Sequence, residues 1–198
     1  MNLLILFLGY LFGSFPSGYL AGRISKGVDI RSLGSGSTGA TNVLRHVGKR
    51  AAITVFLIDV FKGIISILLA KYLLLNDSWQ VAIGLSTLIG HIWPVWLNWK
   101  GGKAVATGLG IFLGLSWQVG LATLGVFILV ITLFRIVSLA SVSAALALPL
   151  IMFLSFDNSY ISLPFLLISL LAMILVIWRH RENVLRLIKG KEPRIRQP

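Results

Sequence analysis

The segment from Arg31 to Arg45 combines the residue types that bind a phosphate group. It runs Arg-Ser-Leu-Gly-Ser-Gly-Ser-Thr-Gly-Ala-Thr-Asn-Val-Leu-Arg and lies between two strongly apolar stretches. Small residues let successive backbone N–H groups converge into an anion nest, and the two arginines add positive charge. The segment therefore predicts phosphate binding at the water edge of a membrane, although a flexible linker with interfacial arginines would have the same composition. The small positions of the expected nest are Gly34, Ser35, Gly36 and Gly39.

A second basic segment has two glycines between lysines, in the order Lys100-Gly101-Gly102-Lys103, and leads through Thr107 into another apolar run. The N-terminus of a helix carries unpaired N–H groups and partial positive charge, so a helix that starts here offers a second phosphate site. A tight turn held at the membrane surface by two lysines is the alternative, and the sequence favours neither. The spacing differs from that of a Walker phosphate loop.

The third polar segment, Arg179-His-Arg-Glu-Asn183, continues to Arg186 at the end of the last apolar run. On one helix Arg179, Asn183 and Arg186 would share a face, and His180 would neighbour Asn183. A basic anchor at the membrane surface would explain the arginines. It explains the histidine and the asparagine less readily.

Three further polar residues lie inside apolar runs. Asp59 and Lys62 are three positions apart and can pair, and His91 lies in the sequence Gly-His-Ile-Trp-Pro. Ionisable groups inside a membrane are costly unless they are paired or hydrated. The sequence favours a structural ion pair for Asp59 and Lys62 over direct contact with a substrate, and a structural role for His91.

Composition excludes several kinds of site. The chain has six carboxylates, which do not cluster, and this argues against a two-metal phosphotransfer centre. It has no cysteine, and its three histidines lack a metal-binding spacing, so neither a zinc site nor a thiolate nucleophile is expected. We therefore predict no metal and no cofactor.

Membrane helices are the elements that must position these segments. Of the 198 residues 57% are hydrophobic and 12% are charged, about half the charged share of a soluble domain. Each apolar run can cross a bilayer core of about 30 Å at about 1.5 Å per residue. We predict an all-α, polytopic protein with a single integral-membrane domain, residues 1–198. The apolar runs are 3–22, 51–75, 79–97, 104–134, 136–154 and 161–178.

The net charge of +12 gathers in residues 23–50, 100–103 and 179–196, which the positive-inside rule places in the cytosol. The first 22 residues lack the basic start and cleavage site of a signal peptide, so we expect a retained helix with its N-terminus outside. The turns at 76–77 and 156–158 are then outside.

The basic residues on either side of the run 104–134 place both of its ends in the cytosol. It should break at Ser116-Trp117-Gln118 and either cross twice or dip and return. About seven membrane helices result, with the C-terminus and every polar segment on the cytosolic side.

Taken together, these segments resemble the bacterial membrane family of glycerol 3-phosphate acyltransferases that use acyl phosphate as donor. The resemblance covers nearly the whole chain, and the order of the motifs is specific. The motifs are Gly34-Ser-Gly-Ser-Thr-Gly-Ala-Thr-Asn42 through Arg45, Asp59-x-x-Lys62-Gly63, Gly90-His91-x-x-Pro94, Lys100-Gly-Gly-Lys103 through Thr107, Arg135-x-x-Ser138-Leu-x-Ser141 and Arg179-His180-x-Glu182-Asn183.

The resemblance implies transfer of a fatty acyl group from acyl phosphate to the 1-hydroxyl of glycerol 3-phosphate. The products would be lysophosphatidic acid and inorganic phosphate, in the first acylation step of phospholipid synthesis. Acyl-CoA and acyl carrier protein would not be direct donors. The expected partners are the two substrates and the lipid of the bacterial cytoplasmic (inner) membrane, with no obligate protein partner and no nucleic acid.

By position, the resemblance implies catalytic roles for Ser35, Arg45, His180 and Asn183, and a structural role for Glu182. It implies that Gly101 and Gly102 hold glycerol 3-phosphate. Family members often have Asn-Pro where this chain has Ser37-Thr38, so a contact from an asparagine side chain at 37 does not carry over. The other residues expected to bind substrate are Gly34, Gly36, Ser37, Thr41, Asn42, Lys100, Lys103, Thr107 and Ser141.

Two mechanisms remain open at this stage. In direct transfer the acyl phosphate is already activated, and the hydroxyl proton passes to His180 or to the donor's own phosphate. In the alternative, Ser35 is a covalent nucleophile and needs a base beside it. A carrier for organic phosphates is the main non-enzymatic alternative, but it should have polar residues from both halves at mid-membrane. A structural membrane subunit would need no pair of anion sites.

Overall fold

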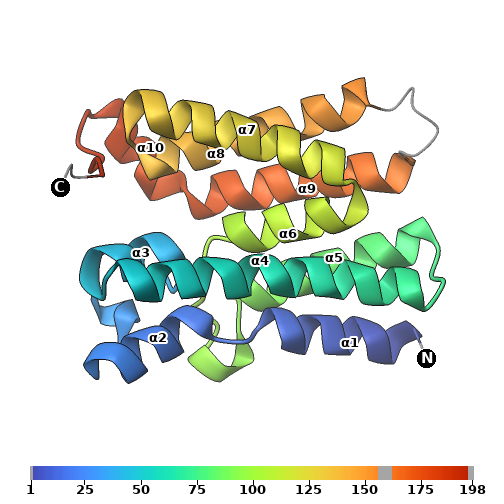
Figure 1. Ribbon diagram of the computed structural model, residues 1–198, viewed down its shortest axis with the longest axis horizontal. Helices are drawn as coiled ribbons and strands as arrows, with labels where there is room; N and C mark the ends of the chain where they lie inside the picture. The colour runs from blue at the N-terminus through green and yellow to red at the C-terminus, as the bar shows by residue number, and fades with distance from the viewer. Residues whose placement is uncertain (1, 156–161, 196–198) are drawn as a thin grey trace. The chain divides into compact units, whose positions relative to one another are not determined.

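The computed structural model describes residues 2–155 and 162–195, and every regular element in that part of the chain is a helix (Figure 1). The predicted all-helical fold is thus confirmed. The chain divides into two compact units, Met1–Leu115 and Ser116–Pro198, and each is described by itself. The division falls at Ser116, where the long apolar run was expected to break.

The first unit holds six α-helices and two short 3-10 helices among its described residues. Helix α4 packs against both α5 and α6, and α1 packs along α5 (Figure 1). In chain order the elements are α1 (Asn2–Gly13), α2 (Ser17–Lys26), η1 (Ile30–Ser32), α3 (Ala40–His46), α4 (Lys49–Tyr72), α5 (Asp77–Ile92), η2 (Val95–Leu97) and α6 (Val105–Leu115).

Glycines bring these helices close together. A Cβ on Gly110 of α6 would overlap the carbonyl oxygen of Val60 in α4, and one on Gly13 of α1 would overlap the backbone of Thr87 in α5. Small residues allow such close backbone approach in membrane helices, where apolar side chains gain little from burial. Two pairs of glycines at four-residue spacing, Gly9/Gly13 on α1 and Gly110/Gly114 on α6, thus mark helix contacts.

The first span is interrupted, which corrects the expectation of one continuous helix over 3–22. Helix α1 ends at Gly13 and α2 begins at Ser17. Pro16 has no N–H to donate to the preceding turn, so the helical hydrogen-bond ladder stops there. The N–H of Ser14 still makes the last helical bond of α1, to the carbonyl of Tyr10, and its Oγ accepts the indole N–H of Trp96 at 3.0 Å.

Helix α5 also stops before its apolar run does. It ends at Ile92, two residues before Pro94, and the chain continues through η2 into an irregular loop. Asn98, Trp99 and Ala104 all have positive φ angles of 51–63° in this loop. Non-glycine residues rarely adopt that conformation, so the surroundings must hold the loop in place.

The second unit contains α7 (Trp117–Phe134), α8 (Val137–Leu154), α9 (Leu163–Arg179) and α10 (Arg181–Ile188). Helix α8 packs against both α7 and α9. Helices α9 and α10 meet at His180 with a bend of 63°. The prediction of one helix carrying both Arg179 and Asn183 was therefore wrong. The turn expected at 156–158 lies outside the described residues.

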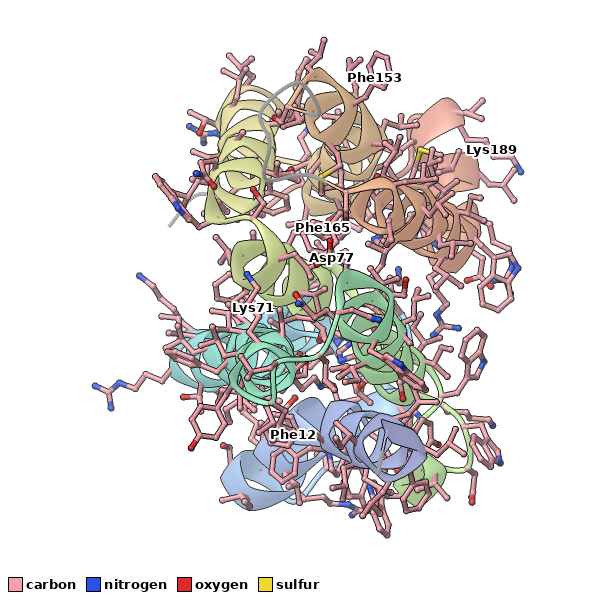
Figure 2. The ribbon with its side chains drawn as sticks, turned by 90° about the vertical axis from the view of Figure 1, so that its right-hand side faces the viewer. Phe12, Lys71, Asp77, Phe153, Phe165 and Lys189 are labelled. Atoms are coloured by element: carbon pink, nitrogen blue, oxygen red, sulfur yellow. The ribbon has the colours of Figure 1, made fainter. Side chains whose placement is uncertain are left out.

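The surfaces of the helices suit a lipid environment. Within the described residues, five helical segments are long and apolar enough to cross a membrane, or six if α9 and α10 form one bent span. Large apolar side chains project outward, and Phe153 of α8 is 61% exposed (Figure 2). Helix α6, with 11 residues, is shorter than these spans.

Lys71 and Asp77 lie at the same end of the first unit, where α4 turns into α5 (Figure 2). Lys71 donates from Nζ to the carbonyl oxygen of Leu115 at 3.1 Å. This bond satisfies a terminal carbonyl of α6, which otherwise lacks an intrahelical donor.

Candidate active site

The loop between α2 and α3 rests on a buried apolar cluster. Ile30 of η1, Val43 of α3 and Val55 of α4 are fully buried and pack together. A Cβ on Gly18 of α2 would overlap the carbonyl group of Thr38, so this glycine lets α2 approach the loop. The segment that was predicted to bind phosphate is thus tied to the helices rather than being a loose linker.

Asn42 organises this loop from within. Its side chain is buried, and Nδ2 lies within 3.0 Å of the carbonyl oxygens of Ile30, Leu33 and Ser37. Its Oδ1 accepts the N–H of Ser35 at 3.3 Å. The carboxamide therefore bonds the loop backbone, which is a different task from the predicted contact with a substrate phosphate.

The expected convergence of N–H groups is largely replaced by bonds inside the loop. The N–H of Ser35 goes to Asn42, that of Gly36 to the carbonyl of Leu33 at 3.0 Å, and that of Gly39 to Oγ of Ser37 at 3.3 Å. An anion at this loop would instead meet the next N–H groups along the chain. Within residues 2–155 and 162–195, no acceptor is found for the N–H groups of Thr38, Ala40 and Thr41.

Arg31 fixes the loop to the end of η2. Its Nη2 pairs with Oδ2 of Asp29 at 2.7 Å, and its Nη1 donates to the carbonyl of Leu97 at 2.9 Å. The side-chain hydrogen bond from Arg31 lowers the pKa of Asp29, against a smaller opposing effect of burial. Of the two arginines in the predicted phosphate segment, Arg31 therefore bonds other groups of the protein.

Ser35 and Arg45 are exposed, one on the loop and the other on α3. Gly34, which precedes Ser35, has a φ of 54° and lies against the ring of His46. His46 donates from Nδ1 to the carbonyl of Asn42 at 3.0 Å, because a carbonyl can only accept. The two residues predicted to be catalytic in this segment are therefore open to a ligand on a supported backbone.

The second glycine loop is attached to the end of α5. Gly101 donates its N–H to the carbonyl of Ile92 at 3.1 Å, and Gly102 donates to that of His91 at 3.0 Å. A Cβ on Gly101 would overlap the His91 carbonyl oxygen, and one on Gly102 would overlap the His91 ring. The glycines are needed for this contact. Lys100 is exposed and Lys103 is partly buried on either side of them.

Next to this loop, around the His91 side chain, the structure brings together polar residues from four helices. Oδ1 of Asp59 accepts from the Ser17 hydroxyl at 2.7 Å and lies 2.8 Å from Nζ of Lys62. Nδ1 of His91 lies 2.9 Å from Nζ of Lys62 and 3.2 Å from the Thr107 hydroxyl. All five side chains are buried. The predicted ion pair is confirmed, and His91 and Thr107 belong to the same cluster.

His180 occupies the bend between α9 and α10 and is buried. Its Nδ1 lies 2.8 Å from the carbonyl oxygen of Val176, so Nδ1 carries the hydrogen. In the neutral ring Nε2 then has the lone pair and can accept a proton. This tautomer suits a general base.

Glu192, after α10, connects three donors of the second unit. Its Oε1 accepts from Asn183 at 2.6 Å and from the Ser138 hydroxyl at 2.8 Å, and its Oε2 accepts from Arg186 at 2.7 Å. Burial disfavours the charged carboxylate, but the bonds from Asn183, Ser138 and Arg186 together outweigh it and lower the pKa of Glu192. The N–H of Ile195 donates to the carbonyl of Arg135, which ties this segment to the turn between α7 and α8.

Two other predicted residues, Ser141 and Glu182, interact mainly with their own helices. Ser141 is buried and donates its hydroxyl to the carbonyl of Val137 within α8. Glu182 is exposed in the first turn of α10, where its negative charge interacts favourably with the positive end of the helix dipole. The carboxylate that links elements of this unit is therefore Glu192.

Ser17 and Glu192 are site residues that sequence reasoning missed. Ser17 is 42 positions from Asp59, and nothing in its local sequence indicates that contact. Glu192 had a signal, because it is one of only two acids within a tail of seven lysines and arginines.

These features define an integral membrane protein whose polar chemistry lies on two glycine loops, a buried ion pair and one bent helix. The profile of the family described as glycerol-3-phosphate acyltransferase matches residues 3–190. A glycerol-3-phosphate acyltransferase of Prochlorococcus marinus (strain NATL2A) is 89% identical over 198 residues, which is the full length of both chains. One from Parasynechococcus marenigrum (strain WH8102) is 62% identical over 195 residues, covering 98% of this chain and 90% of the relative.

Solved structures give the same result. The crystal structure of PlsY (YgiH), an integral membrane glycerol 3-phosphate acyltransferase in its glycerol 3-phosphate form, matches with a TM-score of 0.91 and 37% identity over 98% of this chain and 96% of that one. Its lysophosphatidic acid form matches with a TM-score of 0.88 and 36% identity, over 98% and 95% of the two chains. The chain belongs to the glycerol-3-phosphate acyltransferase family and is a multi-pass membrane enzyme of phospholipid synthesis.

Proposed function

We propose that this enzyme uses acyl phosphate as its acyl donor and makes lysophosphatidic acid and inorganic phosphate from glycerol 3-phosphate. The family match over residues 3–190 carries the proposal. The chemistry of the described residues supports it, because two basic loops suit two phosphorylated substrates. The reaction is proposed to use protein groups alone, in line with the six scattered carboxylates and the absence of cysteine in the sequence.

The proposed mechanism is direct transfer. The 1-hydroxyl oxygen of glycerol 3-phosphate attacks the acyl carbonyl carbon, a new ester bond forms, and the bond to phosphate breaks. Holding two anions together and aligning the hydroxyl is the main task of the enzyme. Arg45 and Lys103 neutralise charge, and the Ser35 hydroxyl donates to the developing oxyanion. The hydroxyl proton passes to Nε2 of His180 or to the departing phosphate.

The two polar residues of the second unit have separate roles in this mechanism. His180 has the tautomer of a proton acceptor, with Nδ1 bonded to Val176. Asn183 is held by Glu192, and this bond fixes the side chain that orients a substrate in the proposed mechanism. The residues proposed to bind the substrates, either by direct contact or by holding the loops in place, are Gly34, Gly36, Ser37, Thr41, Asn42, Lys100, Gly101, Gly102 and Thr107 in the first unit and Ser141 in the second.

We also propose one membrane domain, residues 1–198, with seven membrane helices, an outside N-terminus and a cytosolic C-terminus. Both glycine loops then face the cytosol across the bacterial inner membrane. The placement of basic residues supports this orientation. The enzyme needs no obligate protein partner.

A single assay tests donor and product together. Purified enzyme receives glycerol 3-phosphate with acyl phosphate, acyl-CoA or acyl carrier protein, and mass spectrometry follows lysophosphatidic acid while a coupled assay follows phosphate. We expect equal amounts of both products with acyl phosphate alone. Turnover with acyl-CoA but not acyl phosphate would reject the donor assignment. A trapped acyl ester on Ser35 would reject direct transfer, which loss of activity in Ser35→Ala cannot do.

A further inference from the structure

The buried cluster of Ser17, Asp59, Lys62, His91 and Thr107 has a composition that stability alone does not explain. It joins α2, α4, α5 and α6, and each side chain is at most 6% exposed. Apolar side chains of similar volume would join four helices with less desolvation cost than an ion pair. A cluster of this kind does fix one arrangement of hydrogen bonds, and that arrangement can serve the function of a neighbouring residue.

The arrangement determines the state of His91. The Lys62 ammonium has donors only, so Nδ1 of His91 at 2.9 Å must accept from it. Nζ of Lys62 lies between the Asp59 carboxylate, 2.8 Å away, and Nδ1 of His91, so an ammonium paired with that carboxylate has a donor for each neighbour. His91 is consequently neutral, with its hydrogen on Nε2.

The Nε2 edge of His91 faces the second glycine loop. A Cβ on Gly102 would overlap Nε2, so the ring and the glycine backbone are in direct contact. The same loop is attached to α5 through the carbonyl groups of His91 and Ile92, which accept from Gly102 and Gly101. Any displacement of His91 therefore moves Gly102.

We propose that Asp59, Lys62 and His91 are positioning residues for glycerol 3-phosphate: the ion pair holds His91 as a neutral Nε2–H donor turned to Gly102, and this contact sets the loop that receives the substrate. The inference rests on the proposed function, which assigns that loop to glycerol 3-phosphate. Ser17 and Thr107 complete the hydrogen bonds of the cluster.

Two substitutions of His91 separate positioning from mere packing. In His91→Gln the amide nitrogen reaches the place of Nε2 and keeps a donor there, whereas the shorter His91→Asn places its amide near Nδ1. We expect His91→Gln to keep the KM for glycerol 3-phosphate within about threefold and His91→Asn to raise it about tenfold, the effect of one lost hydrogen bond. The KM for acyl phosphate should stay within about twofold in both, since that substrate uses the other loop.

The ion pair is tested by removing both charges. Asp59→Asn alone leaves a lysine charge buried without its partner, and a failure to fold would be uninformative. The double variant Asp59→Asn/Lys62→Met avoids that charge, so its melting temperature should stay near that of the wild type. Its KM for glycerol 3-phosphate should still rise about tenfold, because the Thr107 hydroxyl, 3.2 Å from Nδ1, is a longer and uncharged replacement for the lost Lys62 donor. Ser66→Ala is the matched control, since this buried serine on α4 donates its hydroxyl to the Gly63 carbonyl within its own helix.

The outcomes distinguish this inference from the proposed function. Equal KM values for His91→Gln and His91→Asn, or an unchanged KM in the folded double variant, would overturn the positioning role. Gly102→Ala addresses the loop itself and should raise the KM for glycerol 3-phosphate whatever His91 does. If Gly102→Ala leaves that KM unchanged, the assignment of the loop fails instead.

Discussion

Replacing Glu192 with alanine removes one acceptor from three donors at once. The carboxylate side chain is 2% exposed and accepts from Ser138, Asn183 and Arg186 at 2.6–2.8 Å. After the substitution Ser138 and Asn183 keep buried polar groups that have lost this partner. The segment after α10 should then separate from α8 more often.

The size of the effect follows from the bonds. Hydrogen bonds to a charged group contribute about 1.5–3 kcal/mol each when buried, which holds for those from Ser138 and Asn183. The Arg186 side chain is 39% exposed, so its pair with Glu192 is screened and adds at most about 1 kcal/mol. The lower bound of about 3 kcal/mol raises the local opening equilibrium about 100-fold.

Native-state hydrogen exchange measures that opening directly. The amides of α10 and of Ile195, whose N–H donates to Arg135, should exchange about 100-fold faster in Glu192→Ala than in the wild type. The control is Glu182→Ala, which removes the same charge from an exposed site on α10. It should change the exchange rates of these amides less than about fivefold. Equal exchange in the two variants would refute the reasoning.

The same contact predicts a pH dependence with a definite sign. The pKa of Glu192 is lowered in the folded state, so its contribution is fully present above the ordinary carboxyl pKa and is lost as the pH falls through the lowered value. Once corrected for intrinsic exchange rates, opening of α10 should increase in the wild type across that acidic range. Glu192→Ala should lack this increase.

Further predictions concern packing, substrate charge and topology. Gly110→Ala places a methyl group where α6 touches α4 and should lower the melting temperature by about 4–8 °C, whereas Gly125→Ala, with open space around it, should not. Arg45→Ala should raise the KM for acyl phosphate about tenfold or more without lowering the melting temperature, because the side chain is exposed, and an unchanged KM would contradict its role. Since the chain has no cysteine, Ser32→Cys and Ser78→Cys report topology cleanly: an impermeant thiol reagent on intact cells should label only Ser78→Cys, and labelling of Ser32→Cys would reverse the orientation.

Patterns that depend on nearby residues were readable from the sequence. Apolar length indicated the helices, and the polar residues of Ser116-Trp117-Gln118 indicated where the long apolar run breaks. Asp59 and Lys62 lie one helical turn apart, so their pairing was a local inference as well. In each case the physical cause acts within a few positions of the chain.

Contacts between distant segments were not readable in this way. The bend at His180 has neither proline nor glycine to announce it, and it separates Arg179 from the helix that carries Asn183. The loop after α2 looked like a nest of N–H groups, but Asn42 and Leu33 accept two of those groups once the chain folds. Composition identified the right segment, while its hydrogen bonds depend on tertiary structure.

In both glycine loops the role of glycine differs from the one that the sequence indicated. Glycine was expected to present N–H groups to a phosphate, yet Gly36 donates to Leu33, and Gly101 and Gly102 donate to the end of α5. In both loops the missing side chain chiefly lets the backbone approach other parts of the protein. The proposed recognition of the substrates then depends mainly on side chains such as Arg45. The glycines determine where these groups stand, so substituting them should alter substrate affinity through displaced neighbours rather than through lost ligands.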